Sequence, residues 1–119
     1  MSSPGSIKSV VLKYFNSWQE PADFDEMQNC LDDNVVIDMG SHTIEGSKNF
    51  IDFLKRGESQ WEKVVLLGSC YTNEGASLFY DGVDVNTKIR TRVAEYLIVR
   101  NDRIVKIIAN ICPLGEVKI

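Results

Sequence analysis

The carboxyl group of Glu95 is the feature of this sequence that most strongly points to chemistry. Glu95 lies in the segment 88–100, where side chains alternate with a period of two, as in a β-strand with one buried face. The face that includes Glu95 is otherwise built from Ile89, Thr91, Val93, Leu97 and Val99. A carboxylate on such a face loses its hydration, so it must be paired with a cation, protonated or beside a cavity. The sequence alone leaves these three alternatives open.

Length, composition and charge favour one ordinary globular domain. The 119 residues are 44% hydrophobic and 25% charged, so we expect a single domain over residues 1–119. The formal net charge is −4, without long runs of like charge, which argues against nucleic acid and anionic membranes as partners. No apolar stretch reaches the length of a membrane-spanning helix.

Cysteine and histidine usage excludes several kinds of site. The three cysteines, Cys30, Cys70 and Cys112, are odd in number and widely spaced, which is typical of reduced thiols in a cytoplasm. One histidine and scattered carboxylates do not form a transition-metal site, and no glycine-rich phosphate-binding motif is present. We therefore expect a cytoplasmic protein that works without a metal or cofactor.

Three helices are predicted in the first half of the chain. An apolar stripe with helical spacing begins after Pro4 and ends before Pro21. Two shorter helices are predicted at 24–31 and 47–55, the second capped by Ser47. The stripe of the first helix consists of Ile7, Val10, Val11, Tyr14, Phe15 and Trp18.

Strands dominate the rest of the chain. A first strand is predicted at 34–38, with a loop at 40–46 before the third helix. A period of two then continues to residue 112, broken by turns at 73–75 and 101–102. Helices that precede a run of antiparallel strands predict an α+β fold with the helices on one face of the sheet. The later strands are predicted at 61–72, 76–85, 88–100 and 103–112.

The outer face of this sheet is expected to be apolar as well. Ile98, Ile104 and Ile108 are predicted to point away from the helices. An apolar face that no helix covers is typical of a subunit interface. We therefore expect a homodimer that forms through this face.

The order of these elements resembles the NTF2-like superfamily, which includes ketosteroid isomerases, SnoaL-type polyketide cyclases, scytalone dehydratase and limonene epoxide hydrolase. The resemblance covers residues 7–112 and implies a cone in which three N-terminal helices pack on a curved antiparallel or mixed sheet around an apolar pocket. Four local features carry it: Lys-Tyr-Phe-Asn-Ser-Trp at 13–18, Asp-Asp-Asn-Val-Val-Ile-Asp at 32–38, Glu-Gly-Ser at 45–47 and Val-Arg-Asn-Asp-Arg-Ile at 99–104.

Three positions are similar to the catalytic residues of ketosteroid isomerase. Tyr14 matches its tyrosine donor, Asp38 its aspartate base, and Glu95 its second, protonated carboxyl group. The resemblance implies that Asp38 moves a proton next to a carbonyl group while the other two donate hydrogen bonds to the enolate oxygen. Two departures weaken the match, since Glu95 replaces an Asp and Met39 replaces the proline that often follows the base.

His42 is the second choice of catalytic group, because related dehydratases and cyclases use a histidine or aspartate as acid or base. Each candidate also has a structural interpretation: Tyr14 as core, Asp38 as a turn residue, Glu95 in an ion pair and His42 as an exposed loop residue. Four other aromatic side chains are predicted to belong to the core or the pocket wall: Trp18, Phe53, Trp61 and Phe79.

Two functions follow from these residues. The first is a cofactor-free isomerase, cyclase or dehydratase that transfers a proton on a hydrophobic carbonyl compound. The second is a binding or accessory domain that holds an apolar small molecule and performs no chemistry. The pKa values and the geometry of Asp38 and Glu95 distinguish the two hypotheses.

Overall fold

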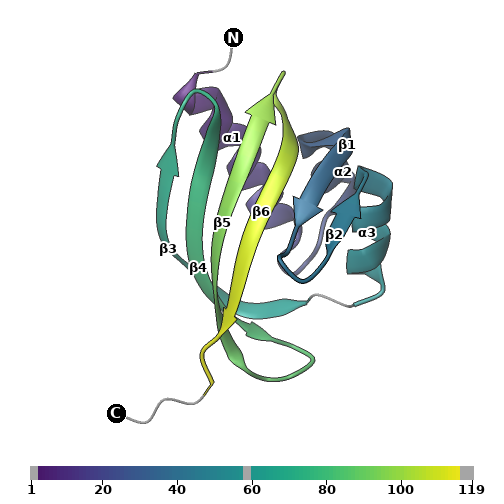
Figure 1. Cartoon of the computed structure of the whole chain (residues 1–119), viewed down its shortest axis with the longest axis vertical. Helices are drawn as coiled ribbons and strands as arrows, with labels where there is room; N and C mark the ends of the chain where they lie inside the picture. The colour runs from purple at the N-terminus through teal and green to yellow at the C-terminus, as the bar shows by residue number, and fades with distance from the viewer. Residues whose placement is uncertain (1–2, 58–59, 116–119) are drawn as a thin grey trace.

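The computed structural model describes residues 3–57 and 60–115. Within them, three helices pack against one six-stranded sheet with two free edges, in the order β2-β1-β6-β5-β4-β3 (Figure 1). β1 runs parallel to β6 and every other neighbouring pair is antiparallel, so the sheet is mixed. This arrangement confirms the predicted α+β class. The elements are α1 (Pro4–Ser17), α2 (Phe24–Cys30), β1 (Leu31–Asp38), β2 (Thr43–Glu45), α3 (Ser47–Lys55), β3 (Trp61–Tyr71), β4 (Gly75–Asp84), β5 (Arg90–Arg100) and β6 (Arg103–Pro113).

The first two helices begin where their sequences provide caps. The backbone N–H of Ser6 donates to the Ser3 hydroxyl at 3.2 Å, and the N–H of Ser3 donates to the Ser6 hydroxyl at 3.1 Å. The N–H of Glu26 donates to the Asp23 carboxylate at 3.0 Å at the start of α2. These bonds satisfy donors that the first turn of a helix leaves open. None of the described helices has the length and hydrophobicity needed to cross a bilayer.

α1 and α2 precede the first strand, and α3 follows β2, so a strand lies before the third helix as the sequence predicted. The predicted loop 40–46 contains β2, which pairs antiparallel with β1. Gly46, with a φ of 92°, is the N-cap of α3, so Ser47 is the first residue of the helix and not its cap. A left-handed φ of this kind favours glycine.

The start of β1 also differs from the prediction. Leu31 was expected at the end of α2, but it is the first residue of β1 and pairs with Ile104 of β6. The register shifts between Leu31 and Val36. Leu31 fits both the apolar spacing of α2 and the apolar run of β1. Its pairing with β6 places it in the strand.

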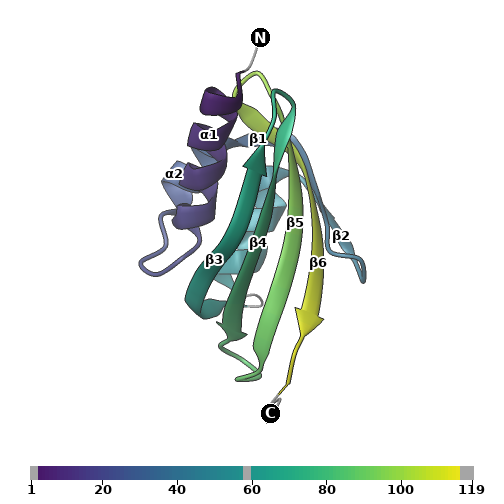
Figure 2. The same cartoon turned by 90° about the vertical axis from the view of Figure 1, so that its left-hand side faces the viewer.

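All three helices lie on one side of the sheet (Figure 2). The face of β5 beneath them is buried at Thr91, Val93, Glu95, Leu97 and Val99, as its alternation predicted. The apolar stripe of α1 packs against this side, where Ile7, Val11, Tyr14 and Phe15 are at most 5% exposed. Glu95 is therefore a carboxyl group in the main core, at 6% exposure.

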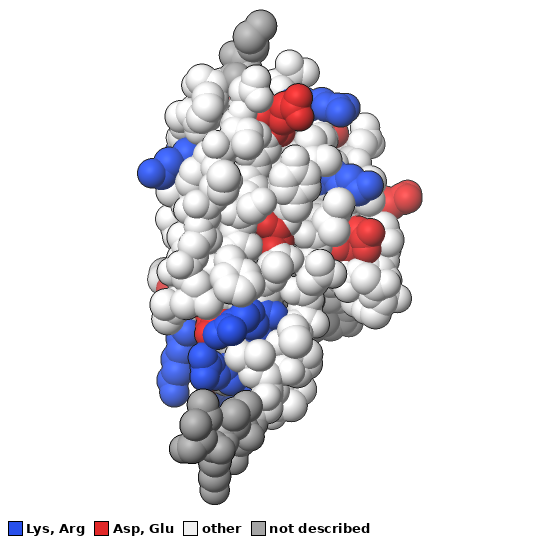
Figure 3. Space-filling view, turned by 60° about the vertical axis from the view of Figure 1, so that its left-hand side comes forward, with Lys and Arg blue, Asp and Glu red and all other residues white. Residues whose placement is uncertain are grey.

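The opposite side of the sheet, here called the outer face, carries exposed apolar side chains. Val65, Phe79 and Tyr96 are 56%, 42% and 40% exposed, so the prediction that Phe79 belongs to the core is wrong. Ile98 and Ile108 are half-buried there. Figure 3 shows basic side chains gathered near one end of the molecule, with a largely uncharged surface above them.

Ile104 does not belong to the outer face, because a β-bulge reverses the phase of β6. Ile98 pairs with Lys106, but Val99 pairs with Ile104, so Val105 is an extra residue on β6. An extra residue moves the side chains that precede it to the other face of the sheet. Ile104 is consequently fully buried.

Candidate functional site

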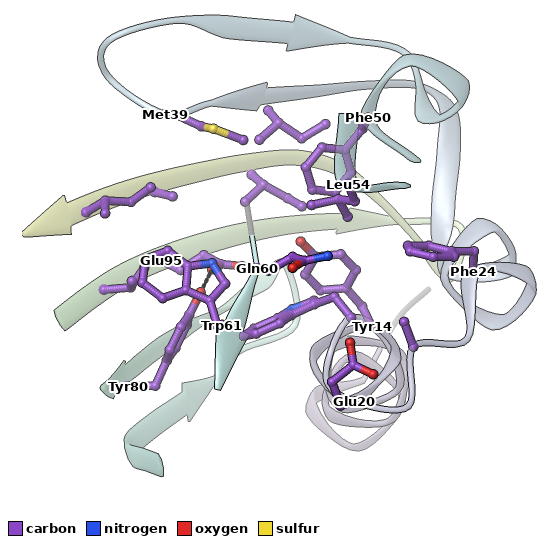
Figure 4. A pocket seen from close by; sticks show the side chains of 17 residues that line it. Tyr14, Glu20, Phe24, Met39, Phe50, Leu54, Gln60, Trp61, Tyr80 and Glu95 are labelled. Carbon is purple, nitrogen blue, oxygen red and sulfur yellow. Dashed lines mark hydrogen bonds between the residues drawn. The ribbon is translucent and has the colours of Figure 1, made fainter. Parts of the chain in front are cut away.

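A cavity of about 90 Å³ lies between the helices and the inner face of the sheet. Figure 4 shows its labelled side chains approaching from several elements, with Tyr14 from α1, Phe50 from α3, Tyr80 from β4 and Glu95 from β5. Glu20 and Gln60 are exposed, so they mark the side where the cavity meets solvent. The lining residues are Tyr14, Trp18, Glu20, Ala22, Phe24, Ile37, Met39, Phe50, Leu54, Gln60, Trp61, Tyr80, Val93, Glu95, Ile107, Ala109 and Ile111.

Tyr80 holds one oxygen of the Glu95 carboxyl group. Its Oη donates a hydrogen bond to Oε2 at 2.6 Å. In the antiparallel pairing of β4 with β5, Leu78 is opposite Glu95 and Tyr80 is opposite Val93. Tyr80 and Glu95 are therefore diagonal neighbours on the inner face, a spacing that long side chains can bridge.

The other carboxyl oxygen, Oε1, is buried and has no hydrogen-bond partner among the described residues. Burial raises the pKa of Glu95 to about 7, and the hydrogen bond from Tyr80 lowers it only in part. A buried carboxyl group with one satisfied oxygen can therefore gain or lose a proton near neutral pH. Such a group suits both general acid–base chemistry and recognition of a polar ligand.

Tyr14 lines the same cavity and is 4% exposed. Burial, and then the charges of Glu95 and Cys30, raise the pKa of Tyr14 well above its ordinary value. Tyr14 is consequently a neutral phenol that can donate a hydrogen bond. Its hydroxyl has no hydrogen-bond partner in the part of the chain that the structure describes. The structure thus brings two of the predicted site residues, Tyr14 and Glu95, to one cavity.

Asp38 does not line this cavity. Its neighbours Ile37 and Met39 do, and successive side chains of a strand point to opposite faces. The Asp38 carboxylate accepts a hydrogen bond from the N–H of Gly40 at 2.8 Å. This is the turn-stabilising arrangement of an Asp at a strand end. The expectation that Asp38 joins the other two residues is therefore not met, because the pleat turns it away.

His42 also lies outside the cavity lining. It is exposed in the turn between β1 and β2, where its Nδ1 lies 2.9 Å from the Ser41 hydroxyl. Its ring centroid is 5.9 Å from that of Phe53. These contacts hold the imidazole against the outside of α3 rather than near Glu95.

Tyr80 and Glu20 are the site residues that the sequence analysis missed. The signal for Tyr80 was present in the alternation of Ala76, Leu78 and Tyr80 on the inner face of β4. Glu20 carried no comparable signal, because it lies between helices where no periodicity applies. Trp18 and Trp61, predicted as core or pocket wall, both line the cavity.

Among residues 3–57 and 60–115, no three His, Cys, Asp or Glu side chains are grouped so that they could hold a metal ion. The described cysteines are all unpaired by disulfides.

Comparison with known proteins identifies the architecture. The sequence matches no family model and none of the curated proteins. The structure is similar to an NTF2-like protein of unknown function from Burkholderia xenovorans LB400, with a TM-score of 0.81 and 13% identity over 96% of this chain and 88% of the other. It is also similar to a steroid delta-isomerase from Pseudomonas aeruginosa, with a TM-score of 0.72 and 11% identity over 92% and 81% of the two chains.

The chain has the NTF2-like fold. A de novo designed protein with a curved β-sheet shares it too, with a TM-score of 0.74 and 17% identity over 92% of this chain and 87% of the other. An NTF2-like fold that occurs in an isomerase, in a protein of unknown function and in a designed protein does not specify a reaction. The residues of the cavity, and not the fold, therefore indicate the function.

Proposed function

We propose that this NTF2-like chain is a small-molecule-binding protein whose cavity takes a compact apolar ligand. The polar group of the ligand bonds the unpaired oxygen of Glu95, and Glu95 changes its protonation state as part of that binding. The observation that carries the proposal is the buried, partnerless Oε1 of a carboxyl group on the cavity wall. Leaving such a group unsatisfied costs about 1–3 kcal/mol, so its position beside a cavity favours a ligand as the missing partner.

The volume of the cavity limits the size of that ligand. A cavity of about 90 Å³ is smaller than the roughly 150 Å³ apolar cavity that admits benzene. Drug-sized ligands occupy pockets of roughly 300–1,000 Å³. A compact molecule, or a compact head group whose body extends past Glu20, therefore fits with the smallest movement of the walls.

The second candidate is a cofactor-free isomerase or cyclase that transfers a proton on a hydrophobic carbonyl compound. The pair of potential donors, Tyr14 and protonated Glu95, favours it, because two donors can stabilise an enolate oxygen. Asp38 is not placed to act as the base, because it does not line the cavity. Glu20 is the other carboxyl group among the lining residues, and it would have to take that role.

Ligand binding and carbon-acid exchange test these candidates separately. Titration with cyclopentanone, tert-butanol and tert-butylammonium, followed by NMR of labelled glutamate, should reveal at least one ligand that shifts the Glu95 carboxyl resonance. Glu95→Gln should weaken that binding at least about tenfold, while the exposed turn variant Glu74→Gln should leave it unchanged. If no compound binds, or if Glu95→Gln binds as well as the wild type, the binding proposal is wrong.

Deuterium exchange alpha to the carbonyl group of cyclopentanone tests the enzymatic candidate. An isomerase should accelerate this exchange, and Glu20→Gln should slow it if Glu20 is the base. Binding without accelerated exchange would leave the protein as a binding domain.

We further propose a homodimer that forms through the outer face. The exposed side chains of Val65, Phe79 and Tyr96 support it, because an apolar surface of this extent on a small protein is commonly covered by a partner. Arg90 and Arg92, which both bond Asp81, would border such an interface at one end of the face.

A further inference from the structure

The charged groups of the cavity wall are all acidic. Glu20 and Glu95 are carboxylic acids, and none of the described lining residues is a lysine, arginine or histidine. An anionic ligand would therefore meet no compensating charge there. A cationic ligand would meet Glu95 inside the cavity and Glu20 at its mouth, and opposite charges attract most strongly where water is scarce.

The other described residues that line the cavity do not provide a cation either. α1 contributes the Tyr14 phenol and β4 the Tyr80 phenol, both kept neutral by burial, which raises each pKa above its ordinary value. α3, β1 and β6 contribute apolar side chains such as Phe50, Ile37 and Ile107. Nothing in this lining stabilises the charged form of Glu95 except the hydrogen bond from Tyr80.

Aromatic rings make up much of the remaining wall. The rings of Trp18 and Tyr80 lie 5.6 Å apart between centroids, and Trp61 lines the same cavity, whereas the Phe24 ring already has the Lys55 ammonium over it at 5.6 Å. The faces of aromatic rings are electron-rich and attract ammonium groups within about 6 Å. Carboxylates combined with aromatic walls therefore favour organic cations over neutral or anionic molecules of the same shape.

We propose that the ligand class of this cavity is a small alkylammonium, whose N–H group binds the unpaired Oε1 of Glu95 while the surrounding aromatic rings contact its alkyl groups. The inference rests on the proposed function above, that the cavity binds a small molecule at Glu95. The ammonium supplies the hydrogen-bond donor that Oε1 lacks, and it leaves the bond from Tyr80 to Oε2 in place. The small volume of the cavity suits a branched alkylamine of four or five heavy atoms better than a fused-ring compound.

The pH dependence of binding distinguishes an ammonium from a neutral acceptor. An aliphatic ammonium remains protonated well above neutral pH, as the side chain of lysine does. It requires ionised Glu95, so its affinity should increase as the pH rises through about 7. A ketone or alcohol that accepts a hydrogen bond from neutral Glu95 should instead lose affinity over the same range.

The decisive experiment compares tert-butylammonium with tert-butanol, which has nearly the same shape but no charge. Calorimetric titration at about pH 8 should show the ammonium binding at least about tenfold more tightly than the alcohol. At about pH 5.5 the ammonium should bind about tenfold or more weakly than at pH 8, because only a small fraction of Glu95 is ionised. Buffers of different ionisation enthalpy should reveal a proton released on binding at the lower pH.

Variants connect this preference to Glu95. Glu95→Gln is nearly isosteric, and it should abolish both the preference for the ammonium and the pH dependence. Glu74→Gln removes one exposed carboxylate from a turn and should preserve both. If Glu95→Gln does not fold, the pH series on the wild-type protein still decides the question.

Three outcomes overturn the inference. One is equal or tighter binding of tert-butanol at pH 8, and another is ammonium affinity that falls as the pH rises. The third is binding of tert-butanol or cyclopentanone at Glu95 without binding of the ammonium, which leaves the proposed function intact. If none of the three compounds binds, the proposed function fails together with this inference.

Discussion

The hydroxyl of Tyr80 donates a hydrogen bond to one oxygen of Glu95 at 2.6 Å, while the other oxygen of the same carboxyl group has no partner among the described residues. The bond fixes the orientation of the carboxyl group at the cavity wall. Because Oε2 accepts from Tyr80, a proton taken up by Glu95 can reside on Oε1. The protonation of Glu95 should therefore affect the free energy of unfolding, the NMR signal of its carboxyl group and the affinity for a ligand.

The first prediction concerns stability and pH. The folded-state pKa of Glu95 is raised from 4.5 to about 7, so the folded protein binds the proton more tightly than the unfolded chain. Its contribution to the free energy of unfolding is fully present below about pH 4.5 and is lost as the pH rises through 7. The loss amounts to about 3 kcal/mol, since each pKa unit corresponds to about 1.4 kcal/mol.

Urea unfolding between about pH 5 and 8 measures this effect. The difference in unfolding free energy between the wild type and Glu95→Gln should change over this range, in favour of Glu95→Gln at higher pH. A difference that is the same at every pH would show that Glu95 does not titrate in this window.

The second prediction concerns Tyr80. Tyr80→Phe removes the hydrogen bond that lowers the pKa of Glu95, so the pKa should rise further. The variant should also lose about 1–3 kcal/mol of stability, because both carboxyl oxygens are then unsatisfied. NMR titration of labelled glutamate reports the first effect and urea unfolding the second. Tyr14→Phe is the matched control, since Tyr14 has no hydrogen bond to Glu95. If Tyr14→Phe raises the pKa of Glu95 as much as Tyr80→Phe does, Tyr80 has no specific role.

The third prediction separates Asp38 from the cavity. Asp38→Ala removes the acceptor of the Gly40 N–H and should destabilise the protein by about 1 kcal/mol. Binding of any cavity ligand should remain within about twofold of the wild-type affinity. A large loss of binding in a folded Asp38→Ala protein would restore Asp38 as a site residue.

The fourth prediction concerns association. Light scattering at micromolar concentration should give twice the 13.4 kDa mass of one chain. Phe79→Glu introduces a charge at the centre of the outer face and should produce monomers, whereas Gln28→Glu on the exposed side of α2 should not. A wild-type protein that scatters as a monomer rules out the dimer.

The parts of the fold that follow a strict periodicity were predictable from the sequence. The alternation in β5 assigned Glu95 to the buried face, and the stripe of α1 assigned Tyr14 to the core, so both residues were found before their surroundings were known. The prediction failed where the period breaks. Because of the bulge at Val105, Ile104 lies on the inner face of the sheet. Because Leu31 pairs with β6, it belongs to β1 and not to α2. Both depend on contacts between segments far apart in the chain.

Which residues come together at the site was harder to predict, because this also depends on contacts between segments far apart in the chain. A family resemblance matched Asp38 by its place in the sequence, but a single step in the pleat decides whether a strand residue points into a cavity or away from it. Tyr80 pairs diagonally with Glu95 only because β4 and β5 adopt one particular register. The register is a tertiary property, and spacing along one strand does not contain it.

Carbon-13 NMR titration of the glutamate side chains measures the protonation of Glu95 itself. We expect one carboxyl group with a pKa of about 7, assigned to Glu95 by its absence from the spectrum of Glu95→Gln. We also expect this pKa to fall when tert-butylammonium is added, because the cation favours the ionised form. If every glutamate titrates near the ordinary value, Glu95 is not the buried, half-satisfied carboxyl group described above, and the proposed binding site is wrong.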